Sequence, residues 1–121
     1  MLTEKGQARS KEKLPEPVPP QQEEVDIALM AFIERYITNL VKSDILANLG
    51  RNPYGLDTVE DIARRIGRSL KVVESELGDL VMLGLVNKIK INSDTVYQLT
   101  HDAGLRQATI KFAIYLNGQE R

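Results

Sequence analysis

The stretch DTVEDIARRIGRSLKVVESELGDLVMLGLVNKIKINSDTVYQLT, residues 57–100, decides the fold of this chain. Its first part holds two short segments of apolar periodicity that a glycine separates, and its second part holds two β-rich runs around a turn. The pattern predicts a helix, a tight turn, a second helix and a two-stranded hairpin, in that order. The predicted fold class is therefore mainly α with a small β-hairpin.

The first helix is predicted to begin after Thr58. The Thr58 hydroxyl can accept a hydrogen bond from the amide of Asp61, and the Asp61 carboxylate can reach back to form a capping box. Gly67 follows the last apolar position, where a left-handed residue can end the helix. Between these limits the apolar residues recur at helical spacing, at Val59, Ile62, Ala63 and Ile66.

The second helix is predicted over about residues 69–83. Ser69 can cap it almost at once, and Gly84 can end it. Two helices joined by so short a turn make a helix-turn-helix unit. Its apolar stripe is predicted to comprise Val72, Val73, Leu77, Leu80, Val81 and Leu83. The positions off this stripe, which can meet a partner, are Leu70, Lys71, Glu74, Ser75 and Gly78.

The two β-rich runs span residues 85–91 and 95–99, around a favourable turn sequence at residues 92–94. We expect Ile91 to pair with Thr95. One face of the hairpin then suits the core. The other face, which suits solvent or phosphate, would carry Val86, Lys88, Lys90, Val96 and Gln98.

Residues 58–100 resemble the winged helix-turn-helix transcription regulators of the MarR, ArsR and PadR type. The resemblance rests on TVEDIARRIGRS (58–69), the spacing of Val73, Leu77 and Leu80, LGLV (83–86) and YxLT (97–100). It departs from many relatives after the hairpin, where LTHDAG (99–104) is one residue longer than their LTxxG, and its wing carries only two lysines.

The resemblance implies a fold and a function. The fold is a winged helix-turn-helix with flanking N- and C-terminal helices. The function is that of a sequence-specific DNA-binding transcription regulator, a homodimer on double-stranded DNA. Its recognition helix, about residues 69–83, would enter the major groove, and its wing, residues 85–99, would lie on the flanking backbone.

The candidate DNA contacts follow from that geometry. Arginine and lysine can reach guanine or phosphate, and serine can bond to either. The candidate set holds six basic residues and two serines, and the six basic residues are expected to converge on one side of the domain. The set comprises Arg64, Arg65, Arg68, Ser69, Lys71, Ser75, Lys88 and Lys90. The competing interpretation of Arg64 and Arg65 is that they form ordinary surface pairs with Glu60 and Asp61, four residues earlier.

Helices are also predicted on both sides of the winged domain, which we place at residues 41–100. The segment 25–49 has helical spacing with a break near residues 38–39, and Gly50 is expected to end it. Leu56 is expected to form a short strand beside the wing. The last helix lies within residues 101–121.

The segment 25–40 and the last helix are assigned to dimerisation, because both carry more apolar surface than one domain needs. The residues expected at the dimer contact are Leu29, Phe32, Ile33, Tyr36, Ile110 and Ile114. The alternative is that the two helices pack only on each other within one chain. Residues 1–24, which are rich in proline and charge, are predicted to be a disordered tail rather than a ligand for a proline-binding groove.

Composition narrows the possible functions. Of 121 residues, 16 are basic and 17 acidic, so a basic face can only be local. There is no cysteine and a single histidine, His101, which excludes a cysteine-ligated metal site and leaves no positioned nucleophile and base. No apolar run reaches the roughly 20 residues of a membrane span. We therefore predict a cytoplasmic protein that is not an enzyme and has no cofactor, metal or membrane partner.

The sequence leaves one alternative function open, a winged-helix adaptor that binds protein and not DNA. The neutral net charge favours it, as do Glu74 in the recognition helix and the apolar Leu70 beside it. The sequence indicates no effector ligand.

Overall fold

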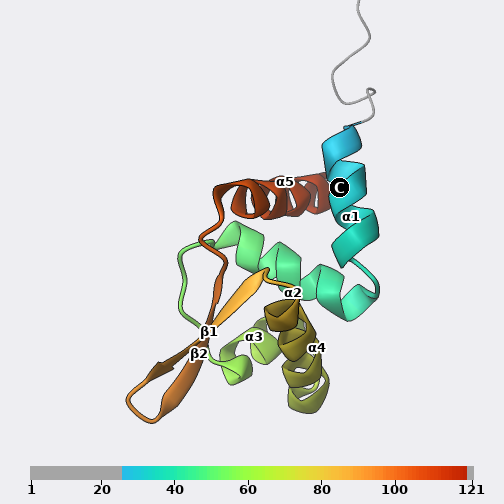
Figure 1. Ribbon diagram of the computed structural model, residues 1–121. Helices are drawn as coiled ribbons and strands as arrows, with labels where there is room; N and C mark the ends of the chain where they lie inside the picture. The colour runs from blue at the N-terminus through green and yellow to red at the C-terminus, as the bar shows by residue number, and fades with distance from the viewer. Residues whose placement is uncertain (1–25, 120–121) are drawn as a thin grey trace, which may run out of the picture.

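The computed structural model describes residues 26–119, so the predicted tail at residues 1–24 lies outside the described residues. The element order is α1 (Ile27–Tyr36), α2 (Leu40–Arg51), α3 (Val59–Ile66), α4 (Leu70–Met82), β1 (Val86–Ile91), β2 (Asp94–Leu99) and α5 (Ala103–Gln119). Figure 1 shows α1 and α5 at one end, the hairpin with α3 and α4 at the other, and α2 between them. The predicted fold class is confirmed.

The helix ends follow the predicted local signals. Asn39 caps α2 by accepting a bond from the Lys42 amide at 2.8 Å, which confirms the break at residues 38–39. Thr58 and Asp61 form the capping box of α3, and Gly67 ends that helix at φ +72°. Ser69 then caps α4. Each signal acts within four residues, so the sequence alone carries it.

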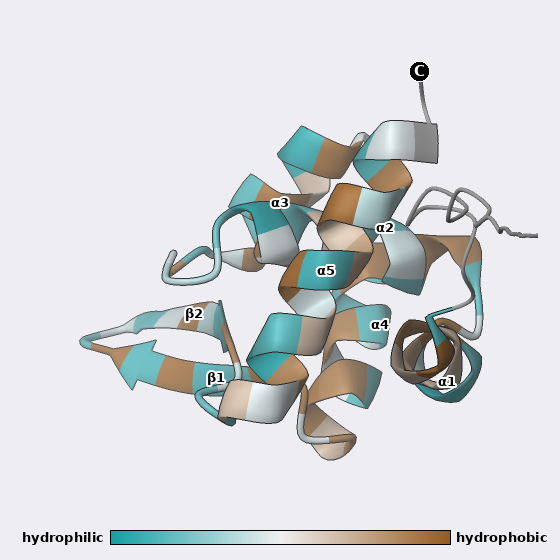
Figure 2. Cartoon of the chain, turned by 90° about the horizontal axis from the view of Figure 1, so that it is seen from above, coloured by the Kyte–Doolittle hydropathy of each residue, from teal (hydrophilic) through white to brown (hydrophobic). Residues whose placement is uncertain are grey.

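Helix α2 forms the centre of the core. Ile45 and Leu46 are fully buried, and α5 packs along α2 more extensively than any other helix does. Figure 2 shows α5 lying across α2, with the hairpin projecting on one side and α1 on the other. The remaining fully buried large side chains of the core come from all parts of the winged domain: Leu49, Ile62, Val73, Leu77, Leu80, Leu85, Val86 and Leu99.

Gly50 does not end α2 as predicted, because the helix continues to Arg51. Gly50 is buried at the crossing of α2 and α5. A Cβ atom there would lie 2.5 Å from the carbonyl oxygen of Thr109 and 2.8 Å from the Cβ of Ala113. The glycine is therefore needed for close packing of α2 against α5. In the sequence, a glycine with this role looks the same as a glycine that ends a helix.

The predicted hairpin register is wrong by one residue. Ile91 pairs with Asp94, so the turn has two residues, and Asn92 takes a positive φ of 57° that asparagine tolerates. A one-residue slip moves side chains to the opposite face. Lys88 consequently shares a face with the buried Tyr97, its direct partner, instead of with Val96 and Gln98.

Three smaller expectations are also corrected. Val72 and Leu83 are 44% and 43% exposed, so they lie outside the apolar stripe of α4. Leu56 forms no strand. The neighbouring Asp57 makes a single antiparallel bridge to Tyr97 instead, with backbone hydrogen bonds of 3.1 and 2.7 Å.

Candidate nucleic-acid interface

No other part of residues 26–119 covers the outward side of α4. Val73, Leu77 and Leu80 are fully buried and hold the helix against the core. The opposite side is solvent-exposed, and it carries the positions predicted off the stripe: Leu70, Lys71, Glu74, Ser75 and Gly78. Ser69 stands at the exposed N-cap, where its hydroxyl accepts a bond from the Val72 amide at 3.3 Å.

The three candidate arginines are ion-paired within the chain. Arg64 binds Asp61 at 2.8 Å, three residues away, so the expected pairing with Glu60 is wrong. This hydrogen bond, with those from Thr58, holds the pKa of Asp61 below its usual value.

The other two arginines reach acids farther along the chain. Arg65 binds the buried carboxylate of Asp57 at 3.0 Å rather than Asp61, and this bond raises the pKa of Arg65. Arg68 binds Asp44 of α2 at 2.7 Å. In each pair the acid offsets the positive charge of the arginine. Within residues 26–119, the positive charge of the predicted set that has no carboxylate partner therefore comes from its lysines.

Lys71, Lys88 and Lys90 are exposed and form no ion pair with any residue from 26 to 119. Lys88 borders a groove of about 440 Å³ between α4 and the hairpin, together with Glu74 and Tyr97. Burial, and then the nearby carboxylates of Glu74 and Glu60, raise the pKa of Tyr97. The groove is thus lined by acidic residues of α4 and by the basic Lys88 of β1.

A buried ion pair that the sequence did not predict holds α4 against α2. The ammonium of Lys42 is almost fully buried and binds Glu76 at 2.5 Å and Asp79 at 3.2 Å. The hydrogen bond from Lys42 lowers the pKa of Glu76. Burial opposes the charge of Lys42, yet its bonds to the two carboxylates raise its pKa overall. The sequence held one indication of this buried ion pair, which is a lysine that lies between the apolar residues Val41 and Ile45.

The candidate dimer residues divide into two groups. Leu29, Phe32 and Tyr36 are buried within the chain, where the Phe32 ring lies 6.1 Å from that of Phe112 in α5. These three residues therefore pack within one chain, as in the alternative to a dimer contact. Ile33 and Ile110 are half-buried, and Ile114 is 67% exposed. On α1 the large apolar side chains that are exposed are Ile27 and Met30.

His101 is exposed, and its Nε2 lies 2.8 Å from the Oε1 of Gln98. Over residues 26–119, no group of three or more histidine or acidic side chains is arranged to hold a metal. No helix within that range has the length and apolar character to cross a membrane.

The helix-turn-helix, the exposed α4 and the hairpin define a winged helix-turn-helix protein. The chain matches no protein-family profile and no curated sequence. Among solved structures it is similar to the transcriptional repressor BigR from Xylella fastidiosa, with 19% identity and a TM-score of 0.60 over 78% of this chain and 90% of that one.

Two further structures show the same fold. One is the homodimeric winged helix-turn-helix DNA-binding domain Mb0332 from Mycobacterium bovis, described as a possible ArsR-family regulator; identity is 20% and the TM-score 0.56, over 84% of this chain and 92% of that one. The other is MepR from S. aureus in complex with DNA, with 18% identity and a TM-score of 0.53 over 74% and 69% of the two chains. At these identities the similarity establishes the fold.

Proposed function

We propose that this protein is a sequence-specific DNA-binding transcription regulator of the cytoplasm, acting as a homodimer. One observation carries the proposal: α4 is anchored by a fully buried stripe, exposes its opposite side from its N-terminus onward, and borders the hairpin from Glu74 to Met82. That is the arrangement in which a recognition helix enters the major groove. The solved DNA complex of MepR, which has the same fold, supports it.

Within this interface, the exposed lysines and serines have separate roles. Ser75 lies on the exposed side of α4, where side chains reach base edges, Ser69 stands at the helix start, and Lys71 beside it contacts a phosphate. Lys88 and Lys90 contact the flanking backbone from the wing. Arg64, Arg65 and Arg68 contribute only after their ion pairs open, so their contacts with DNA are weaker than their charge suggests.

The first prediction concerns salt. The three lysines that form no ion pair within residues 26–119 give a slope of log K against log salt of about −3 per bound domain. Lys71→Gln should weaken binding about equally on all sequences and reduce the slope by about 1. The measurement is fluorescence anisotropy of a labelled duplex at several salt concentrations.

Lys111→Gln is the matched control, because it removes one positive charge from the exposed side of α5, where Lys111 pairs with Asp26 at 2.9 Å. It should leave the slope unchanged. Equal effects of the two variants would mean that only net charge matters. Absence of binding by the wild type at low salt would reject the regulator.

The second prediction concerns the dimer. The exposed apolar residues of α1 and α5 form the subunit contact, and Ile114 contributes from both copies in a two-fold interface. Ile114→Glu should raise the dimer dissociation constant by about 100-fold or more, since each copy loses a buried isoleucine. Analytical ultracentrifugation measures this directly. Ile91→Glu, at the exposed end of β1, is the control and should leave the dimer intact. An Ile114→Glu protein that dimerises like the wild type would remove this face from the interface.

The adaptor function remains a second candidate because of apolar exposure on α4. Leu70 and Val72 are each 44% exposed and Met82 is 87% exposed. The acidic Glu74 is exposed on the same helix. In a DNA-binding protein, Leu70→Asp weakens binding only because the new negative charge repels DNA. In an adaptor, the same change removes a hydrophobic contact with the protein partner. Partner binding that is insensitive to salt and to Lys71→Gln, but lost with Leu70→Asp, would identify the adaptor.

A further inference from the structure

Four polar side chains join the middle of α4 to the start of α2. The ammonium of Lys42 binds the carboxylates of Glu76 and Asp79, at 2.5 and 3.2 Å. The side-chain amide of Asn39 also donates to Glu76, at 3.2 Å. Glu76 and Asp79 are three residues apart, so both lie on one flank of α4. We call residues 39, 42, 76 and 79 the α2–α4 polar cluster.

The polar cluster begins shortly after the chain leaves α1. Helix α1 ends at Tyr36, Asn39 caps α2, and Lys42 lies in the first turn of α2. In the proposed function, α1 is part of the dimer contact and α4 is the recognition helix. The cluster therefore connects the helix that contacts DNA to the chain segment that follows a helix of the subunit contact.

The chemistry of the polar cluster suits the positioning of α4 better than its stabilisation. Lys42 is only 5% exposed, and an ion pair buried to this degree often contributes no more than apolar residues of the same size would. Hydrogen bonds weaken steeply with distance and angle, whereas apolar side chains of about the right size pack in more than one arrangement. The apolar stripe thus holds α4 against the core, and the polar cluster selects one position for it.

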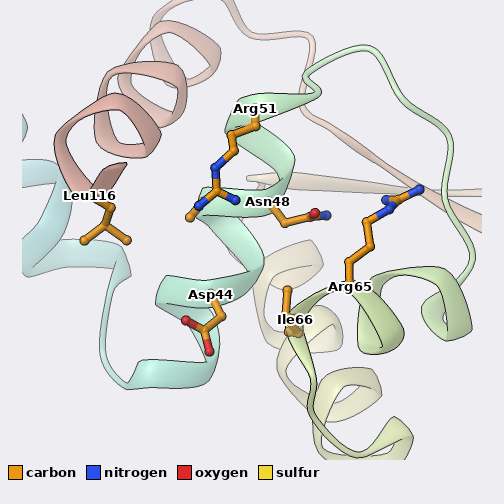
Figure 3. A pocket seen from close by; sticks show the side chains of 7 residues that line it. Asp44, Asn48, Arg51, Arg65, Ile66 and Leu116 are labelled. Atoms are coloured by element: carbon orange, nitrogen blue, oxygen red, sulfur yellow. The ribbon is translucent and has the colours of Figure 1, made fainter. Parts of the chain in front are cut away.

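A second polar contact holds only the beginning of α4. The carboxylate of Asp44, which lines the pocket shown in Figure 3, binds Arg68 at 2.7 Å, directly before the N-cap of α4. Both side chains are more than one-third exposed, so this pair is weak. Without the polar cluster, α4 can pivot about this end, and its displacement is then largest at Met82, the last residue of the helix.

We propose that Lys42 and Glu76 are positioning residues, which fix α4 relative to α1 and thereby set the spacing of the two DNA half-sites that a dimer binds. This inference rests on the proposed function. The half-site spacing of a dimeric DNA-binding protein follows the separation of its two recognition helices. A two-fold axis repeats any displacement of α4 in the second copy, so the separation is sensitive to the position of α4. Other residues of α4 set the bases that each copy contacts, so the half-site sequence does not depend on the cluster.

The test compares the wild type with two variants. The double variant Lys42→Met with Glu76→Leu removes one positive and one negative charge, so the net charge is unchanged, and an apolar contact replaces the ion pair. It should melt close to the wild-type temperature. Val86→Ala is the control, because it truncates a side chain that is 2% exposed at the start of β1 and leaves the polar cluster intact. It should melt at a lower temperature than the other two proteins.

The first measurement uses the full chain without DNA. The sequence has no cysteine, so spin labels can be attached at Glu34→Cys in α1 and Met82→Cys in α4, two exposed positions. When the labelled chain is diluted with unlabelled chain, double electron–electron resonance reports the distance between the labels within one copy. The wild type and Val86→Ala should give the same narrow distance distribution, and the double variant should give a broader or displaced one. A distribution in the double variant equal to that of the wild type would overturn the proposal.

The second measurement selects binding sites from a random-sequence duplex library. The wild type and Val86→Ala should enrich paired half-sites at one spacing. The double variant should enrich the same half-sites, with its preference for that spacing reduced about tenfold, an ordinary strength of coupling between two sites. An unchanged preference in the double variant, or an equal loss in Val86→Ala, would contradict the positioning role. A wild type that enriches no sequence would reject the proposed function, whereas the distance measurement would still decide whether the cluster positions α4.

Discussion

Gly50→Val is expected to destabilise the protein by about 3 kcal/mol or more, because overpacking a well-filled contact costs about 1–3 kcal/mol and occasionally more, which outweighs the few tenths of a kcal/mol that valine gains over glycine in helix propensity. The nearest atoms to a new Cβ are the Thr109 backbone oxygen and the Ala113 Cβ, at 2.5 and 2.8 Å. Backbone cannot rotate away, so α2 and α5 must separate. At fixed protein concentration the melting temperature should fall by about 12 °C or more.

Two alanine variants separate this contact from helix propensity. In an unhindered helix, glycine to alanine stabilises by about 0.5–1 kcal/mol. Gly78 lies inside α4, and a Cβ there would meet nothing within 4 Å. Gly78→Ala should therefore raise the melting temperature, whereas Gly50→Ala should lower it. A rise in melting temperature in both variants would show that the α2–α5 contact has room for a Cβ atom at Gly50.

Lys42→Met is expected to cost about 2 kcal/mol, because it leaves the carboxylate of Glu76, whose side chain is 19% exposed, with only the amide of Asn39 as a partner. The figure lies below that of a fully buried pair, since the side chain of Asp79 is 60% exposed. Denaturant unfolding measures the loss. The double variant Lys42→Met with Glu76→Leu should recover most of it, since both charges are then absent. A neutral single variant would show that the pair contributes nothing.

The same pair predicts how stability depends on pH. The pKa of Glu76 is lowered in the folded protein from its ordinary 4.5. Its contribution is therefore complete above that value and is lost as the pH falls through the lower folded pKa. Unfolding of the wild type should become easier below about pH 4.5, and the deficit of Lys42→Met should shrink over the same range.

The candidate interface was only partly accessible to sequence reasoning. The exposed positions of α4 follow from helical spacing and are where the spacing places them, apart from Val72. The acids that pair with Arg65 and Arg68 could not be foreseen, because Asp44 lies 24 residues before Arg68. The competing interpretation paired Arg64 with Glu60, four residues earlier. Arg64 instead binds Asp61, which lies three residues earlier.

The sequence by itself determined the order of the described helices and strands of the winged domain, the starts of α3 and α4, and the end of α3. Thr58, Ser69 and Gly67 act within one helical turn, so their effect does not depend on the rest of the chain. Apolar spacing likewise selects the buried side of each helix before any packing occurs.

Only the tertiary structure decided the features that depend on two segments meeting. The crossing of α5 gave Gly50 its role, and the approach of α4 to α2 paired Lys42 with Glu76, 34 residues away. Such contacts form between groups whose distance along the chain is large, and their partners are set by the shape of the packed core rather than by local preference.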